Sequence, residues 1–247
     1  MPDSFNPLKR ETLVAHLAGL GVGSCTPVMV HASLRKTGPI DGGADTLIDA
    51  LIEAQGRDGT LVMPLGSEDG DVFDALTSRA EAEIGVLAEV FRQREGVRVN
   101  DHPAARFAAR GPLAAELLEP IPLNDYYGPG SPLSRFALLG GWVLRLGANV
   151  DTVTLTHWAE YLADVPGKRR VRRRYVRADT GEQWIESLDD SQGITDWPHG
   201  DYFSQILVDF LAAGHARSGR VGNCNAELFP AQPFVDFAVQ WMEKNLA

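Results

Sequence analysis

Apolar residues along the chain recur either at helical spacing or in short continuous runs. Three leucines at helical spacing, followed by glycines, predict a first helix over residues 8–20: Leu13, Leu17 and Leu20. The apolar run 28–30 predicts a buried strand, and the polar loop 31–43 is rich in turn residues. A helix from about residue 45 to Gly56 and a strand over 59–64 follow. Strand, helix and strand in this order form a βαβ unit, which favours a parallel sheet.

The rest of the chain continues in the same way. We expect further helices over residues 81–94, 113–118, 203–213 and 233–244, and further strands over residues 142–146, 171–177, 183–185 and 220–229. A polar stretch, 151–154, is a plausible cap for a helix that holds His157, and residues 179–181 indicate a hairpin turn. The pattern predicts a single α/β domain over residues 1–247. Its central sheet is expected to be mainly parallel and flanked by helices, with a small antiparallel β-hairpin region.

Charge and composition narrow the choice of partners. The net charge of −10, from 33 acidic and 23 basic residues, makes nucleic acid and anionic membranes poor partners and favours a cationic small molecule. The same charge can also serve solubility alone. No apolar run approaches the roughly 20 residues that span a bilayer. Cys25 and Cys224 form neither a disulfide framework nor a metal-ligand spacing, so we expect a cytoplasmic protein without a metal.

The loop 31–43 is the first candidate for chemistry. It connects a strand to a helix, so backbone N–H groups and a helix start are available to anionic groups. Ser33, Arg35 and Lys36 add a hydroxyl and two cations, which suits a phosphorylated cofactor such as coenzyme A. The loop has neither a Walker nor a GxGxxG pattern, and an ordinary α/β turn explains it equally well.

The second candidate is the segment that contains Thr154 and His157. These residues are three positions apart at a helix start that follows a predicted strand, the place where α/β enzymes put their sites. Histidine is the side chain best suited to proton transfer near neutral pH. A structural histidine is the alternative.

Charged clusters form the third group of candidates. Acidic residues concentrate in a few loops: Glu68, Asp69, Asp71, Asp125, Glu186, Asp189, Asp190 and Asp196. They can bind a cation or simply form a solvated surface. The basic run 168–174 alternates like a strand, and on so acidic a chain we interpret it as a solvent-facing strand. Cys224 lies on a predicted strand without an activating motif, which favours a buried packing role.

Taken together, these segments resemble the aminoglycoside 3-N-acetyltransferase family, which is distinct from the GNAT acetyltransferases. The collinear segments that carry the resemblance are residues 30–35, 42–44, 59–64, 102–103, 130–133, 143–147, 153–160 and 221–223. The resemblance implies transfer of an acetyl group from acetyl-coenzyme A to the 3-amino group of an aminoglycoside, and hence antibiotic resistance. The segment between Pro64 and His102 is shorter than in many members, and it reads Phe73-Asp74-Ala75 at an FDP-like element.

The resemblance also assigns roles to residues. It implies His157 as the general base, with Thr154 as a donor to the oxyanion and Asp190, or Asp189, as the carboxylate that orients the histidine. It implies that acetyl-coenzyme A is held by His31, Ser33, Leu34, Arg35, Lys36, Thr37, Gly38 and Ser131. The acidic acceptor surface is expected from Glu68, Asp69, Asp125, Glu160 and Asp189. A homodimer is a candidate assembly. Two alternatives stay open: a member that acetylates another amine, and a non-catalytic protein that sequesters cationic ligands.

Overall fold

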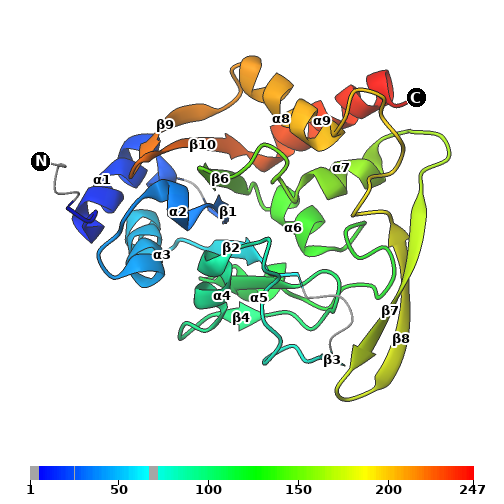
Figure 1. The fold of residues 1–247 in the computed structure, drawn as a ribbon, viewed down its shortest axis with the longest axis horizontal. Coiled ribbons are helices and arrows are strands. Elements are labelled where there is room, and N and C mark those ends of the chain that lie inside the picture. Colours follow the sequence, from blue (N-terminus) through cyan, green and yellow to red (C-terminus); the bar gives the residue numbers. More distant parts are fainter. Residues whose placement is uncertain (1–5, 25, 67–71) are drawn as a thin grey trace, which may run out of the picture.

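The computed structural model describes residues 6–24, 26–66 and 72–247, and its elements form two sheets with helices packed around them (Figure 1). The strands are β1 Val28–Ala32, β2 Leu61–Pro64, β3 Val72–Phe73, β4 Arg98–Val99, β5 Phe107–Arg110, β6 Trp142–Leu146, β7 Arg170–Arg177, β8 Gly181–Leu188, β9 Arg217–Val221 and β10 Cys224–Pro230. The α-helices are α1 Arg10–Leu20, α2 Leu34–Thr37, α3 Gly43–Gln55, α4 Val86–Arg92, α5 Ala114–Leu117, α6 Pro132–Leu138, α7 Thr156–Leu162, α8 Tyr202–Ala212 and α9 Ala231–Asn245, and a 3-10 turn covers Val22–Ser24.

Strand β1 lies at the centre of the larger sheet, whose order is β4-β5-β2-β1-β6-β10-β9. It pairs in parallel with both β2 and β6, and α3 makes the crossover between β1 and β2. Helices cover both faces of a parallel sheet, so such strands are apolar throughout. Val28, Met29 and Val30 of β1 are accordingly buried. The predicted βαβ unit is therefore confirmed.

The prediction of a mainly parallel sheet is wrong, because the outer strands run the other way. β5 pairs antiparallel with β2, β4 with β5, β10 with β6, and β9 with β10, so the sheet is mixed. The segment predicted as one strand over 220–229 is a hairpin instead. Its tight turn lies at Gly222 and Asn223, where Gly222 has φ +59. An antiparallel neighbour needs only such a short turn, which the apolar pattern of the strands does not reveal.

Two hydrophobic cores cover the two faces of the sheet. The first packs α6, α7, α8 and α9 against residues such as Met29, Val143 and Phe229. The second packs α1, α3 and α4 against Val30, Leu144 and Leu228. Neighbouring strand residues alternate between the two cores, as the pleat of a buried strand requires. The buried leucines of α1 lie in the second core, as their spacing predicts.

The smaller sheet consists of β3, β7 and β8 and stands at the opposite side of the molecule from α1 (Figure 1). β7 and β8 form the predicted antiparallel hairpin, and β3 pairs in parallel with β7. The arginines of the basic run alternate in exposure along β7, which confirms the interpretation of a solvent-facing strand. Arg172 lies over the ring of Trp184 at 4.8 Å, and Arg174 pairs with Glu182 at 3.1 Å. The positive charge of the run is therefore balanced partly within the hairpin, by Glu182 and Glu186, and partly by acids outside it.

Several local predictions need correction. The helix predicted over 81–94 is confined to α4, because Gly85, with φ +98, precedes it. The loop after β1 contains the short helix α2, and α6 follows the proline-rich stretch, with Pro132 in its first turn. Within the described parts of the chain, no helix is long and apolar enough to cross a membrane.

Candidate active site

The candidate base, His157, lies in the first turn of α7, which follows the carboxyl end of β6. The backbone N–H of His157 donates to the carbonyl of Thr154 at 3.1 Å, so the two residues share one turn, as predicted. Arg145 of β6 holds the intervening loop, because its Nη2 donates to the carbonyls of Ala148 and Asn149. The end of a buried strand therefore sets the position of the histidine.

Glu160 is the carboxylate that orients His157. Glu160 Oε2 lies 2.9 Å from Nδ1 of the imidazole, and its other oxygen accepts from the hydroxyl of Tyr202. Because a carboxylate only accepts, the geometry assigns a proton to Nδ1 and leaves Nε2 as the base. The expectation that Asp190 or Asp189 makes this contact is wrong. The expectation that Glu160 contacts substrate is also wrong, since its side chain is 1% exposed.

The surroundings of His157 tune its basicity. Burial by itself disfavours the charged imidazole, but the hydrogen bond to Glu160 and the charges of Glu160 and Asp190 outweigh it and raise the pKa of His157. Aromatic rings fix the plane of the imidazole. Tyr127 stacks on it at 4.9 Å between ring centroids, and Phe203 lies at 4.9 Å on a tilted plane. The side chain stays 14% exposed, so its free nitrogen is accessible.

A cavity of about 760 Å³, here called the donor cavity, joins His157 to the loop after β1. Among its lining residues are His31, Ser33, Leu34, Arg35, Lys36, Asn149, Asp151, Thr154, His157 and Phe203. Ser33 caps α2 by accepting from the backbone N–H of Lys36, which places both cations at the rim. Lys36 Nζ also donates to Asn149 Oδ1 at 2.9 Å, so the ends of β1 and β6 are tied together.

Three residues expected to hold the donor lie away from this cavity. Thr37 is buried, donates to the carbonyl of Ser33, and packs on Cys224. Gly38, at φ +107, packs against the side chain of Asn223. Ser131 is buried as the N-cap of α6 and accepts from the N–H of Ser134. All three therefore make structural contacts, and their contact with the donor stays a prediction. Cys224 is buried, as expected.

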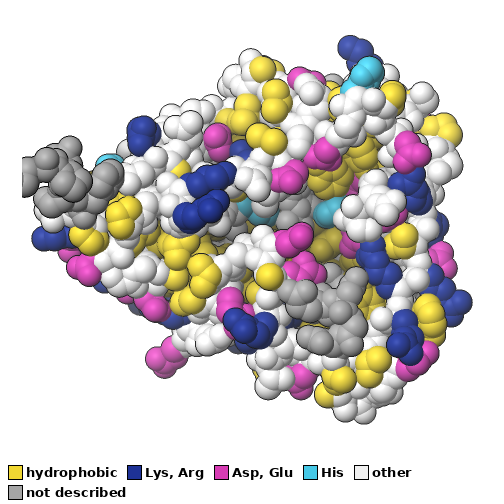
Figure 2. Space-filling model, viewed as in Figure 1, with side chains coloured by type: hydrophobic (Ala, Val, Ile, Leu, Met, Phe, Trp, Pro, Cys, Tyr) yellow, Lys and Arg dark blue, Asp and Glu magenta, His cyan; other side chains and the backbone are white. Residues whose placement is uncertain are grey.

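A second cavity of about 760 Å³, the acidic cavity, meets the donor cavity at His157, Asp151 and Phe203. It is lined by Asp151, His157, Asp190, Ser191, Gln192, Gly193, Thr195, Asp196, Trp197, Gly200, Asp201, Tyr202 and Phe203. No lysine or arginine is among these described lining residues. Figure 2 shows the central hollow with histidine side chains inside it and with both acidic and basic side chains around it.

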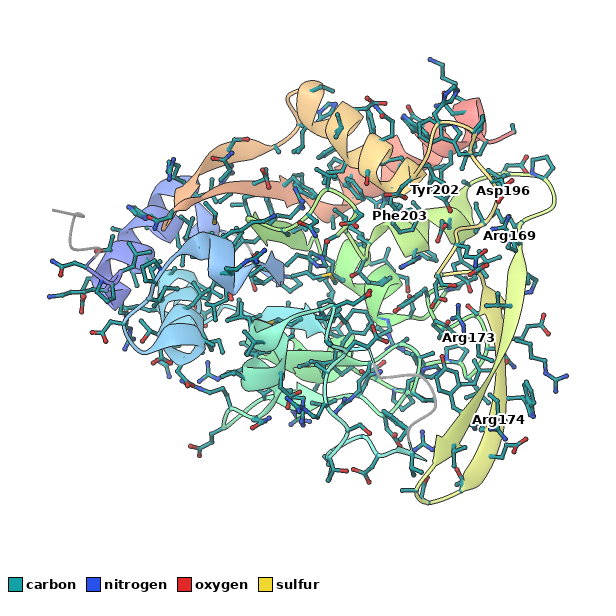
Figure 3. The ribbon with its side chains drawn as sticks, in the orientation of Figure 1. Arg169, Arg173, Arg174, Asp196, Tyr202 and Phe203 are labelled. Atoms are coloured by element: carbon teal, nitrogen blue, oxygen red, sulfur yellow. The ribbon has the colours of Figure 1, made fainter. Side chains whose placement is uncertain are left out.

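The aspartates of the acidic cavity differ in the ion pairs and hydrogen bonds that their carboxylates already make. Asp190 binds Arg173 and accepts from the hydroxyl of Tyr126. Asp196 pairs with Arg169 at 2.5 Å near the start of α8 (Figure 3). Asp201 caps α8. Among described residues, Asp151 accepts from the hydroxyl of Thr152 and forms no ion pair, although the charge of Arg145 acts on it from a distance.

The remaining predicted acceptor acids do not line the acidic cavity. Asp189 is 3% exposed and accepts from the N–H groups of Ser191 and Gln192, so its carboxylate stabilises its own loop. Asp125 lies 2.9 Å from Arg170 and accepts from the hydroxyl of Tyr161. Both carboxylates thus have structural partners, and their contact with the acceptor stays a prediction. Glu68 and Asp69 lie outside the described residues.

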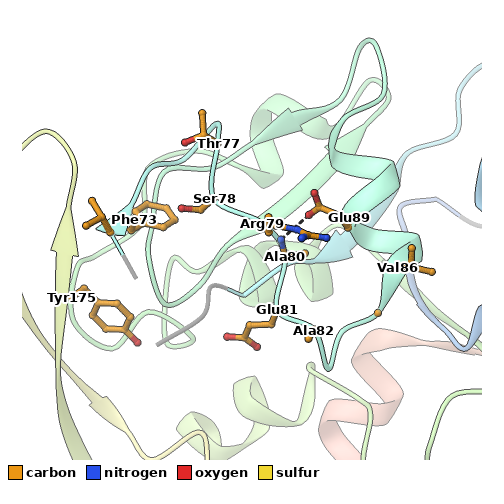
Figure 4. Close-up of a pocket in the computed structure, with 12 residues that line it drawn as sticks. Phe73, Thr77, Ser78, Arg79, Ala80, Glu81, Ala82, Val86, Glu89 and Tyr175 are labelled. Atoms are coloured by element: carbon orange, nitrogen blue, oxygen red, sulfur yellow. Dashed lines mark hydrogen bonds between the residues drawn. The ribbon is translucent and has the colours of Figure 1, made fainter. Parts of the chain in front are cut away.

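A third cavity, of about 700 Å³, adjoins the donor cavity through Glu81, Gly85 and Val86 (Figure 4). Phe73 and Tyr175 line its far side. Its wall is held in place by Glu89, which accepts from the N–H of Ala80 at 2.7 Å and pairs with Arg92. The hollow beside the donor cavity therefore has an ordered wall.

Sequence reasoning missed the residues that complete the site. Tyr127, Asp151, Tyr202 and Phe203 come from loops or helix starts that had no assigned chemistry. A signal for the correct carboxylate was present, because His157 and Glu160 stand three positions apart on a helix, where side chains meet. The aromatic contacts had no such local signal.

The comparisons with known proteins agree with one another. The model of the family described as aminoglycoside 3-N-acetyltransferase matches residues 29–243. Aminoglycoside N(3)-acetyltransferase VIII of Streptomyces fradiae is 37% identical over 97% of this chain and 93% of its own length. Among solved structures, AAC-IIIb in a binary complex with CoASH has a TM-score of 0.92 at 35% identity and covers 98% of both chains. AAC-VIa bound to sisomicin has a TM-score of 0.90 at 35% identity and covers 98% of this chain and 100% of its own. The chain therefore belongs to the aminoglycoside 3-N-acetyltransferase family.

Proposed function

We propose that this protein transfers the acetyl group of acetyl-coenzyme A to the 3-amino group of an aminoglycoside, with His157 as the general base, and so confers resistance to the antibiotic. One observation carries the assignment. His157 lies where a cavity with cations at its rim meets a cavity lined by aspartates. An anionic donor and a cationic acceptor can therefore approach the same imidazole from opposite sides.

The donor cavity fits coenzyme A. Arg35 and Lys36 are exposed at its rim, where they are suited to the phosphates of the donor. The cavity then runs past His31 to Thr154 and His157, where the thioester would lie. The relative AAC-IIIb was solved with CoASH, which supports the same ligand here.

The acidic cavity fits a polycationic amine. Asp151 lines both cavities beside His157 and forms no ion pair among described residues, and it does not cap a helix as Asp201 does. Asp190 and Asp196 add negative charge, although arginines partly balance it. The relative AAC-VIa was solved with sisomicin, which supports an aminoglycoside as the acceptor.

The chemistry follows from the protonation states. His157 Nε2 takes a proton from the attacking amine while Glu160 stabilises the imidazolium that forms. The nitrogen forms a bond to the thioester carbonyl carbon, the carbon–sulfur bond breaks, and the imidazolium returns the proton to the leaving thiolate. The hydroxyl of Thr154, which lines the same cavity, is a candidate donor to the oxyanion. The cytoplasmic location and a homodimer stay predictions.

The test is release of free thiol from acetyl-coenzyme A, measured with aminoglycosides that carry or lack a 3-amino group, followed by location of the acetylated nitrogen. We expect release only with the 3-amino compounds. His157→Ala should reduce turnover by about 10²- to 10⁴-fold, the range for a general base, while coenzyme A binding is retained. Release with unrelated amines only would reassign the acceptor. Acceptor binding without thiol release would indicate a sequestering protein.

A further inference from the structure

His31 is a buried histidine whose hydrogen bonding is incomplete. It lies near the carboxyl end of β1, is 4% exposed, and lines the donor cavity. Its Nε2 has no hydrogen-bond partner among the described residues. A buried polar atom without a hydrogen bond is destabilising, so such atoms are rare unless a ligand or water completes them. The position therefore indicates contact with the donor.

The strand pleat directs His31 toward the reacting end of the cavity. Met29 packs in the same core as Ala159 of α7, and His31, two residues further along β1, points to the same face. His31 and Arg145 are register partners on β1 and β6. Arg35 and Lys36 are exposed, whereas His31 is buried and lines the same cavity as Thr154 and His157. His31 is thus placed for the thioester rather than for the phosphates.

The electrostatics of this place favour a neutral hydrogen-bond donor. Burial, and then the charge of Arg145, lower the pKa of His31 to about 3, so the ring stays uncharged at physiological pH. A neutral imidazole still carries one N–H, and it does not compete with His157 for the proton of the amine. Arg145 is 2% exposed, and although its Nη1 pairs with Glu227 at 3.0 Å, its Nε has no described partner. The guanidinium on the neighbouring strand therefore disfavours a second proton on the ring.

We propose that His31 is a second catalytic residue, which donates a hydrogen bond to the thioester carbonyl oxygen and stabilises the negative charge that forms there. The inference rests on the proposed function. As the amine nitrogen bonds to the carbonyl carbon, the oxygen gains charge and His31 holds it. When the carbon–sulfur bond breaks, the sulfur leaves with the electron pair. His31 keeps its own proton throughout, and His157 carries the proton of the amine.

The kinetic test compares His31→Phe, which removes the N–H, with His31→Gln, which retains an N–H donor. We expect His31→Phe to lower kcat by about 10²- to 10³-fold, the loss typical of an oxyanion donor. Coenzyme A lacks the thioester carbonyl that His31 would contact, so the dissociation constant of coenzyme A should change less than about threefold. His31→Gln should recover part of the rate. Thr37→Val, a polar-to-apolar change at a buried residue outside the cavity, is the control for packing and should leave kcat within about threefold.

A spectroscopic test separates this inference from the proposed function. The infrared carbonyl stretch of carbonyl-¹³C acetyl-coenzyme A bound to the protein, without acceptor, reports the hydrogen bond directly. We expect a lower frequency in the wild type than in His31→Phe, with His31→Gln between them. Unchanged frequency, or a kcat of His31→Phe within about threefold of wild type, would overturn the role. If the frequency shifts but no aminoglycoside is acetylated, the proposed function fails while the carbonyl contact stands.

Discussion

At the scale of single residues, one carboxylate decides the basicity of the candidate base. Glu160 is buried and divides its two oxygens between His157 and Tyr202. The buried Tyr202 has its pKa raised by burial and by Glu160, so it keeps its proton and donates it to the carboxylate. Stacking on Tyr127 therefore fixes the plane of the imidazole, and the contact with Glu160 favours its charged form.

Glu160→Gln should move the acid limb of the kcat/KM profile to lower pH. Glu160 raises the pKa of His157, and so the wild-type base becomes neutral at a higher pH than it would without this carboxylate. Without the negative charge, burial dominates and the pKa of His157 falls. The plateau should also fall, by up to about 10²-fold, because a weaker and less well oriented base catalyses less. A pH–rate profile from pH 5 to about 9 measures both effects.

Asp196→Asn is the matched control for this profile. Asp196 lines the same acidic cavity but pairs with Arg169 and does not contribute to the pKa shift of His157. Its acid limb should coincide with that of the wild type. If the limb of Glu160→Gln stays in place or moves to higher pH, Glu160 does not set the basicity of His157.

At the scale of elements, short segments after strands shape both sides of the site. The α2 turn after β1 presents Arg35 and Lys36 to the donor cavity. The loop over residues 189–200 forms the wall of the acidic cavity, and Tyr202 connects it to the base, because its hydroxyl accepts from the N–H of Ile194 at 2.8 Å. The conformation of this loop is thus coupled to Glu160.

Arg35→Ala combined with Lys36→Ala should raise the KM for acetyl-coenzyme A by up to about thirtyfold, because exposed ion pairs contribute at most roughly 1 kcal/mol each. The KM for the aminoglycoside and kcat should change little, since the acidic cavity is separate. Steady-state kinetics with each substrate varied in turn measures this. Arg57→Ala, in the turn after α3, is the control for lost positive charge. A rise in the aminoglycoside KM alone would mean that α2 does not bind the donor.

Gly193→Ala should lower kcat by disturbing Tyr202. A Cβ at Gly193 would lie 2.4 Å from the Tyr202 hydroxyl oxygen, and Gly193 also has φ +78. The loop or the tyrosine must shift, so the hydroxyl moves away from Glu160. Gly200→Ala is the matched control, because Gly200 has φ +111 in the same loop but nothing within 4 Å of its Cβ. We expect a clear kcat loss, about tenfold, only for Gly193→Ala. Equal kcat losses in both variants would mean that backbone strain alone acts.

At the scale of the whole molecule, the distribution of charge matters more than its sum. The net charge is −10, yet Arg35 and Lys36 bring two cations to the donor cavity, whose lining also includes Glu81, Glu83 and Asp151. The acidic cavity contains no lysine or arginine among its described lining residues. A polycation is therefore attracted to one side of His157, and an anionic donor to the other.

Asp151→Asn should raise the KM for the aminoglycoside about three- to tenfold with a smaller change in kcat, as for lost ground-state binding. It should also flatten the increase of this KM with ionic strength, because salt screens partly exposed pairs. Asp58→Asn, an identical charge change in the turn after α3, should leave both unchanged. Measurements from about 0.02 to 0.5 M salt test this. An acceptor KM that is indifferent to salt and to Asp151→Asn would assign the acidic charge to solubility.

The sequence by itself determined the central part of the fold and the position of the base. Apolar periodicity is a local property, so it predicted α1, β1, β6 and the crossover that makes β1 and β2 parallel. His157 follows a buried strand and shares a turn with Thr154, which the local order of residues already indicates. Arg35 and Lys36 of α2 were predicted at the donor site for the same reason, because they directly follow a buried strand.

Only the tertiary structure decided which acids do what. Glu160, Asp189 and Asp190 are all carboxylates near the base, and their roles depend on partners such as Tyr202 and Arg173 that lie far away in sequence. The antiparallel outer strands were decided in the same way, because strand direction depends on long-range pairing and not on the apolar pattern of each strand. Local spacing places a side chain on an element, whereas its burial and its partner are properties of the packed chain.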